Sequence, residues 1–77
     1  MENMQQLLLD TAFAASQRFP GKPIRVWYIM LGKRAWKAII INKDNKFRMA
    51  EGPIRATHKS CLVALKNQLE AAARKTS

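Results

Sequence analysis

The sequence is poor in residues that metal-binding, membrane-spanning and secreted proteins require. One cysteine, Cys61, cannot form an internal disulfide, and one histidine, His58, leaves too few ligands for a zinc site. The longest unbroken apolar run, Val26 to Leu31, is far shorter than the roughly 20 residues of a membrane-spanning helix. The first residues show no basic region or cleavage site typical of a secretory signal. We therefore expect an intracellular protein of the cytoplasm or nucleus, without membrane contact, metal or cofactor.

Groups suited to catalysis are also scarce. The five acidic residues are spread along the chain without the spacing of an acid–base pair, and the three glycines fall in turns rather than in a phosphate-binding loop. One candidate dyad remains, His58 and Cys61, three positions apart at the start of a helix. The alternative is that Cys61 is a small core residue and His58 an exposed residue of the first turn. We favour this alternative and predict no catalytic residue and no enzymatic activity.

Acidic residues are outnumbered by basic ones. The chain has 14 Lys and Arg against 5 Asp and Glu, a net charge of +9. Eleven of the basic residues lie between Arg18 and Lys59, where only Asp44 and Glu51 oppose them. Such a charge attracts polyanions, of which nucleic acid is the first candidate and an acidic protein the second. A basic surface that serves only solubility is the third possibility.

The first segment, residues 3–19, has the apolar spacing of a helix. Asn3 and Gln6 form a capping pair at its start, and two prolines and a glycine in residues 20–23 end it. The residues expected on its buried face are Met4, Leu8, Ala12, Ala15 and Phe19, with Leu7 and Thr11 beside them.

The middle of the chain predicts three strands, over residues 24–31, 35–42 and 46–51. The turn Gly32-Lys33-Arg34 separates the first two, and residues 43–46 form the second turn. A last helix is expected over residues 57–74, with Cys61, Leu65, Leu69 and Ala72 on its buried stripe. The 77 residues therefore predict one α+β domain of order α-β-β-β-α, a three-stranded antiparallel sheet with two helices packed on one face.

Strand register predicts the two faces of the sheet. With Asp44 and Asn45 at the tip of the second turn, Ile40 should lie opposite Met49 and Asn42 opposite Phe47. Trp36, Ala38, Ile40, Phe47 and Met49 then share the face that packs on the helices. The orientation of the first strand depends on whether the Gly32 turn has two or three residues. We favour Val26, Tyr28 and Met30 on the helix side.

The opposite face of the sheet is expected to be unusually apolar. Two helices cover one face of a three-stranded sheet, and the other face of such a sheet ordinarily alternates with polar residues. The residues expected there without an intramolecular cover are Trp27, Ile29, Leu31, Ile39 and Ile41. An apolar patch of this kind on a small protein marks a protein contact, and a homodimer or another protein partner would bury it. The alternative places one helix on each face.

Basic residues are predicted to meet phosphates at three places. Arg55, His58 and Lys59 cluster where the last helix begins, with Lys66 two turns further on. Lys33 and Arg34 occupy the tip of the first hairpin, and Lys43 and Lys46 lie around the second turn. Together these residues would clamp a phosphate backbone at several points.

The element order and one local motif resemble the double-stranded-RNA-binding domain. Thr57-His58-Lys59-Ser60-Cys61 is similar to the Ser-Lys-Lys-x-Ala pattern of that family, whose lysines grip phosphates across the major groove. His58 replaces one of those lysines, and the turn Gly32-Lys33-Arg34 is shorter than the family's Gly-Pro-x-His loop. The resemblance implies binding of duplex RNA, while some domains of this kind serve as dimerisation modules. We predict a non-enzymatic nucleic-acid-binding domain, with a protein-interaction or homodimerisation module as the alternative.

Overall fold

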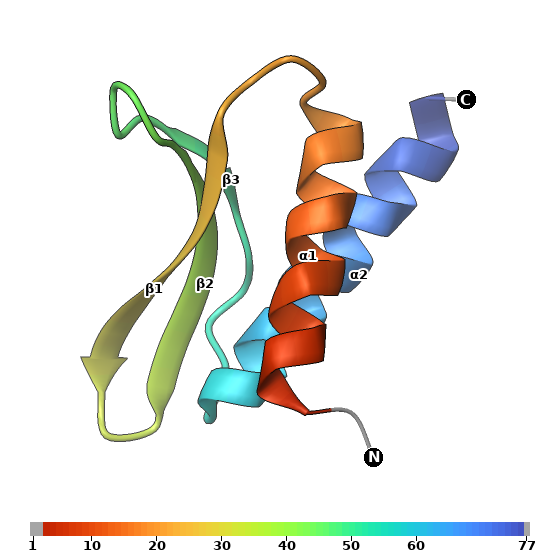
Figure 1. Ribbon diagram of the computed structural model, residues 1–77. Helices are drawn as coiled ribbons and strands as arrows, with labels where there is room; N and C mark the ends of the chain where they lie inside the picture. The colour runs from red at the N-terminus through yellow and green to blue at the C-terminus, as the bar shows by residue number, and fades with distance from the viewer. Residues whose placement is uncertain (1–2, 77) are drawn as a thin grey trace.

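The computed structural model describes residues 3–76, with side chains as far as Ala72. Its elements are α1 (Met4–Arg18), β1 (Ile24–Gly32), β2 (Ala35–Asn42), β3 (Arg48–Glu51) and α2 (His58–Thr76). The strands form one antiparallel sheet in the order β1-β2-β3, and the two helices lie side by side against one face of it (Figure 1). We call this the inner face and the opposite one the outer face. The predicted α+β fold is confirmed.

Helix α1 begins and ends where local chemistry requires. The side chain of Asn3 accepts a hydrogen bond from the N–H of Gln6 at 2.7 Å, which confirms the predicted N-cap. At the other end the N–H of Phe19 donates to the carbonyl of Ala15 at 2.9 Å, and Pro20 follows. Because proline cannot continue the helix, the chain turns away towards β1 at this point.

The buried stripe of α1 is rotated from the predicted one. Its centre is Leu7, Thr11, Ala14 and Ala15, while the predicted residues Met4, Leu8 and Ala12 are only partly buried. Thr11 can lie in the core because its hydroxyl donates to the carbonyl of Leu7 at 2.7 Å. Its polar group is thereby satisfied within the helix, and a polar residue takes a central position that apolar spacing alone does not predict.

Strand β1 has the favoured orientation. Val26 pairs with Ile40 and Tyr28 with Ala38, and all four pack in or against the core on the inner face. The hairpin closes with Gly32 opposite Ala35, so the turn contains two residues, and the register is irregular between Met30 and Gly32. Met30 lies at this end and is 64% exposed, so it faces the helix side without packing on it.

Strand β3 departs from the predicted register beyond Arg48. Ile41 lies opposite Arg48, as the predicted register requires, but Ile40 lies opposite Ala50 rather than Met49. Met49 is therefore the extra residue of a β-bulge, and it packs against the core from its rim. The bulge turns Glu51 to the outer face, opposite Ile39, and leaves Arg48 on that face as predicted.

The turn before β3 keeps the predicted register. Lys46 has φ 62, in the left-handed region, and its N–H donates to the carbonyl of Asn42 at 2.8 Å. The N–H of Asn42 donates to the carbonyl of Phe47 at 2.9 Å, so these two residues lie opposite each other as predicted, and β3 starts at Arg48 instead of residue 46. Phe47, predicted to face the helices, is 69% exposed, which corrects that expectation.

Helix α2 supplies four of the nine buried residues of the core cluster. The hydroxyl of Thr57 accepts a hydrogen bond from the N–H of Ser60 at 3.1 Å, as expected of a cap. The helix residues that are fully or almost fully buried are Cys61, Leu62, Leu65 and Leu69. Gly52 lies so close to this helix that an added Cβ would approach the Cβ of Leu65 to 3.1 Å. Nowhere in the described chain is a helix long and apolar enough to span a membrane.

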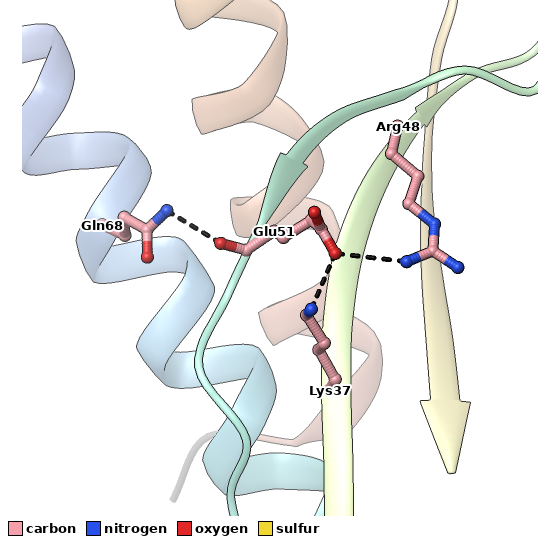
Figure 2. Close-up of polar contacts among 4 residues, drawn as sticks. All are labelled: Lys37, Arg48, Glu51 and Gln68. Atoms are coloured by element: carbon pink, nitrogen blue, oxygen red, sulfur yellow. Dashed lines mark hydrogen bonds and ion pairs between the residues drawn. The ribbon is translucent and has the colours of Figure 1, made fainter. Parts of the chain in front are cut away.

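The outer face differs from the expected open patch at Ile39. This residue is only 2% exposed. It lies in register between Trp27 on one side and Glu51 on the other. The ammonium of Lys37 is 2.7 Å from the carboxylate of Glu51, which also contacts Arg48 at 3.2 Å (Figure 2). The low exposure shows that Ile39 is covered within the chain, and long charged side chains such as these can cover apolar neighbours with their aliphatic parts.

Ile41 is covered in the same way. It is 9% exposed and lies between Arg25 and Arg48 in the register. The expectation that Ile39 and Ile41 lack an intramolecular cover is therefore wrong. The apolar side chains that do remain exposed on or near this face are Trp27 at 47% and Leu31 at 56%, the latter at the irregular end of β1.

Candidate nucleic-acid interface

Two basic clusters from distant parts of the chain meet at one end of the molecule. The main chain of Arg55 bonds that of Trp36 in both directions, at 2.7 and 2.8 Å, which forms an isolated bridge beyond β3. Trp36 stands two residues after Arg34, so this bridge brings the approach to α2 beside the hairpin tip. Figure 1 shows that the β1–β2 turn and the first turn of α2 lie at the same end. We call this the basic end, and define it by Lys33, Arg34, Arg55 and Lys59.

All four side chains of the basic end are exposed. The guanidinium of Arg55 donates to the neighbouring carbonyl of Ile54 at 3.3 Å, a weak local contact that leaves its other N–H groups available for a ligand. No acidic residue occurs between Asp10 and Asp44, or between Glu51 and Glu70. The segments that supply the cluster thus carry no carboxylate of their own.

The first turn of α2 adds to this positive field. It contains no acidic residue, and Thr57 satisfies one of its N–H groups. The remaining N–H groups of a helix start and the partial positive charge of its dipole favour an anion. Lys59 lies in this turn. The helix start and the flanking cations therefore act on a phosphate in the same direction.

His58 is placed differently from the outward position expected of it. Its ring meets that of Tyr28 edge-on, with centroids 3.8 Å apart, and lies 5.1 Å from that of Trp36. The Nε2 atom is enclosed and has no hydrogen-bond partner among the described residues, and the same is true of the hydroxyl of Tyr28. His58 therefore packs against the sheet, and its enclosed nitrogen is turned away from a phosphate.

The Cys61 thiol is a core group. It is fully buried, and its sulfur donates to the main-chain carbonyl of His58 at 3.0 Å rather than to the imidazole. Burial raises the pKa of this thiol. Burial is also the main cause that raises the pKa of Tyr28, with a smaller contribution from Cys61. Within residues 3–72 no three His, Cys, Asp or Glu side chains gather to hold a metal.

Lys66 lies away from the basic end. Seven residues of helix separate it from Lys59, about 10 Å along the axis. Its ammonium is 3.7 Å from the carboxylate of Glu70, and its side chain is 23% exposed. Lys66 is thus partly balanced, and it could reach only a ligand that extends along α2.

A second surface lies on the outer face of the sheet. A groove of about 320 Å³ is lined by Arg25, Trp27, Ile29, Ile39, Ile41, Lys46 and Arg48. The guanidinium of Arg25 lies 5.0 Å from the ring centre of Trp27. Four of the five residues predicted as an interface line this groove, and Leu31 does not.

Strand alternation places Arg25 and Arg48 on this face, but the predicted interface did not include the cations of the groove. Arg25 could have been found, because it alternates with Trp27 on the same side of β1. Arg48 lies opposite Ile41, as the predicted register requires, and Lys46 reaches the groove from the turn before β3. The left-handed conformation of Lys46 has no firm signal in a single sequence.

Comparison of the chain with protein-family models, with curated proteins and with solved structures gives no match. The functional argument therefore depends on the residues and their arrangement.

Proposed function

We propose that this domain binds nucleic acid without catalysing a reaction, and that duplex RNA is its preferred form. The observation that supports this most is the meeting of Lys33 and Arg34 with Arg55 and Lys59 at one end of the molecule. Two chain segments about twenty residues apart thereby present cations in one direction, and neither contains a carboxylate. Phosphates of a duplex backbone are ligands that such a multi-point surface suits.

The preference for RNA rests on the arrangement of elements. The order α-β-β-β-α, with both helices on one face, is compatible with the double-stranded-RNA-binding domain. Proteins of that kind recognise the shape of an A-form duplex through phosphates and ribose hydroxyls, not through base sequence. We accordingly expect tighter binding to duplex RNA than to duplex DNA of the same sequence, with little dependence on that sequence.

Salt dependence tests the proposal directly. Binding of a labelled duplex RNA is measured by fluorescence anisotropy between 50 and 200 mM salt. With about four phosphates neutralised, log K should fall against log salt with a slope near −3.6, if the coefficient for duplex DNA applies. Lys59→Ala should weaken binding and flatten the slope by about one unit, because one fewer counterion is released.

Lys22→Ala is the matched control. Lys22 is exposed and lies in the loop between α1 and β1, and Figure 1 shows this loop at the opposite end of the molecule from the β1–β2 turn. Lys22→Ala removes the same charge as Lys59→Ala, so an equal loss of RNA affinity in the two variants would indicate attraction by net charge alone. Absence of RNA and DNA binding at 50 mM salt would refute the proposal.

A protein-interaction module remains the second candidate, and the outer groove is the observation that favours it. Ile39 and Ile41 form its apolar floor, and Arg25, Lys46 and Arg48 border it. The bordering cations would repel one another if two copies packed face to face, so the groove itself suits an acidic partner better. A domain that binds no nucleic acid in the titration above would favour this function.

A further inference from the structure

The two edges of the sheet are unequal. The β3 edge has four residues, and α2 lies against it, where the side chain of Gln68 donates to the carbonyl of Glu51 at 3.0 Å (Figure 2). The β1 edge has nine residues, and no described strand pairs with the side of β1 that points away from β2. A long unpaired edge presents a row of N–H and C=O groups that another strand can bond.

Hydrogen bonding within the sheet identifies these free groups. The main chains of Trp36 and Ala38 bond towards the β3 side, to Arg55 and to the N–H of Gly52. Because successive residues of a strand direct their N–H and C=O groups to opposite sides, Ile39 must bond towards β1. Its partner there is Trp27.

The same alternation applies along β1. If Trp27 bonds β2, the main-chain groups of its neighbours Val26 and Tyr28 point away from the sheet, as do those of Ile24 and Met30. The side chains of these four residues face the inner side. A strand added at this edge would therefore bond Val26 and Tyr28 and place its own side chains beside Trp27 on the outer face.

The edge lacks the usual protection against pairing. Natural edge strands carry lysines, prolines, bulges or inward charges, or they are short. In β1 the bulge at Leu31 lies near one end, and the seven regular residues before it, Ile24 to Met30, include one charge, on Arg25. Trp27, at the middle of this regular stretch, is 47% exposed.

We infer that the β1 edge pairs antiparallel with β1 of a second copy of this chain, with the two Trp27 residues at the two-fold axis. Trp27 is the midpoint of the regular stretch, so this register overlaps all seven residues. It also sets Val26 opposite Tyr28 of the other copy, so that the main-chain N–H and C=O groups that point away from β2 in each copy bond each other. The two Trp27 residues then form a non-hydrogen-bonded pair, the closer kind, in which aromatic side chains interact well.

The positions of the charged residues are compatible with this register and with a second copy as the partner strand. Arg25 lies opposite Ile29 of the other copy, and the two Arg25 residues are four positions apart, about 13 Å. That distance exceeds the screening length of about 8 Å at 0.15 M salt. The net charge of +9 on each copy still opposes association at low salt, so the dimer should strengthen as salt rises. This is opposite to the behaviour expected of RNA binding.

Disulfide trapping tests the register. In a Cys61→Ala background, Arg25→Cys and Ile29→Cys variants are mixed and oxidised, and the products are identified by mass. The inferred pairing puts these two positions directly opposite each other, within the Cα distances that a disulfide spans. Each variant alone would have its cysteines about 13 Å apart. We expect the mixed disulfide to form at least about tenfold faster than either homodimer.

Sedimentation tests the interface itself. The unmodified protein should be a dimer at high micromolar concentration and 0.15 M salt, and its dissociation constant should rise at about 0.01 M salt. Trp27→Lys places like charges at the axis and should raise the dissociation constant at least about tenfold. Phe47→Lys, at a more exposed aromatic residue outside β1, makes the same charge change and should leave the dimer intact.

Both experiments can contradict the inferred dimer. A monomer at every salt concentration, or homodisulfides that form as fast as the mixed one, would overturn the inference. If Trp27→Lys does not fold, as judged by circular dichroism, the disulfide comparison still tests the register. The result is independent of the proposed function, because the basic end is not part of this edge.

Discussion

The ring of His58 lies edge-on to that of Tyr28, and this contact changes what the first turn of α2 offers to a ligand. Position 58 follows a helix cap, where local rules predict an exposed residue. Its real surroundings are set by β1 and β2, which lie far from it in the sequence. The caps at Asn3 and Thr57 could be predicted because their partners lie three residues away. The burial of His58 depends on tertiary contacts and could not be predicted in this way.

Tyr28→Phe tests the energetic cost of this contact. The hydroxyl of Tyr28 is enclosed and has no hydrogen-bond partner among the described residues. Folding therefore removes it from water without a replacement bond, so deleting it should not destabilise the protein. We expect the free energy of unfolding, measured by urea denaturation, to stay the same or rise by up to about 1 kcal/mol.

Tyr28→Leu is the control for the ring. It removes the hydroxyl and also the edge-on contact with His58, so it should lower the free energy of unfolding by about 1 kcal/mol or more. A loss of more than about 1 kcal/mol in Tyr28→Phe would mean that the hydroxyl does have a bonding partner.

At the scale of elements, the bulge in β3 organises the outer face. Because Met49 is the extra residue, Arg48 and Glu51 both point outward and contact each other at 3.2 Å. Lys37 of β2 joins the same carboxylate at 2.7 Å, and the carbonyl of Glu51 accepts from Gln68 of α2 (Figure 2). Glu51 thus links β3 to the rest of the sheet and to a helix.

The pH dependence of stability should reveal this link. The ammonium of Lys37, followed by the guanidinium of Arg48, lowers the pKa of Glu51 below its usual value near 4.5. The folded state therefore favours the ionised form, and the stabilisation is present above that value and lost as the pH falls through the lowered pKa. We expect the thermal midpoint of Glu51→Gln to fall less between about pH 6 and pH 3 than that of the unmodified protein.

Lys37→Gln provides the second measurement. It removes the largest cause of the pKa shift and should likewise reduce the loss of stability on acidification. If both variants keep the full pH dependence of the unmodified protein, another group is responsible for it.

The elements themselves were predictable to within a few residues, whereas their pairing was not. Apolar spacing located both helices and all three strands, since each pattern is local and several residues long. The register of β3 depends on the bulge at Met49, which turns Glu51 to the outer face and has no firm signal in a single sequence. The cover of Ile39 depends on that same register through Glu51.

Over the whole molecule, positive charge is the property that acts at the longest range. The net charge of +9 is carried by a body of 35 × 30 × 22 Å. Sequence composition alone predicts attraction to polyanions, but it does not say where the cations gather. The bridge between Trp36 and Arg55 determines where they gather, because it brings two charged segments to one end of the molecule. This is why the candidate site could be predicted in part: its lysines and arginines were identified from the sequence, and the fold determines which of them lie at the same end.

The same charge should make the stability of the protein depend on salt. Like charges repel more strongly in the compact state than in the unfolded chain, where they are further apart. Raising the salt from about 0.01 to 0.15 M shortens the screening length from about 30 to 8 Å, which is less than the dimensions of the molecule. We therefore expect the thermal midpoint to rise over this range, although salt weakens the contacts of Glu51.

A double variant, Lys22→Glu with Lys43→Glu, changes two exposed lysines and lowers the net charge from +9 to +5. Its midpoint should rise less with salt. Measurement at two protein concentrations separates this effect from association, because self-repulsion within one chain does not depend on concentration. A midpoint that falls with salt in both proteins would show that local ion pairs outweigh the net charge.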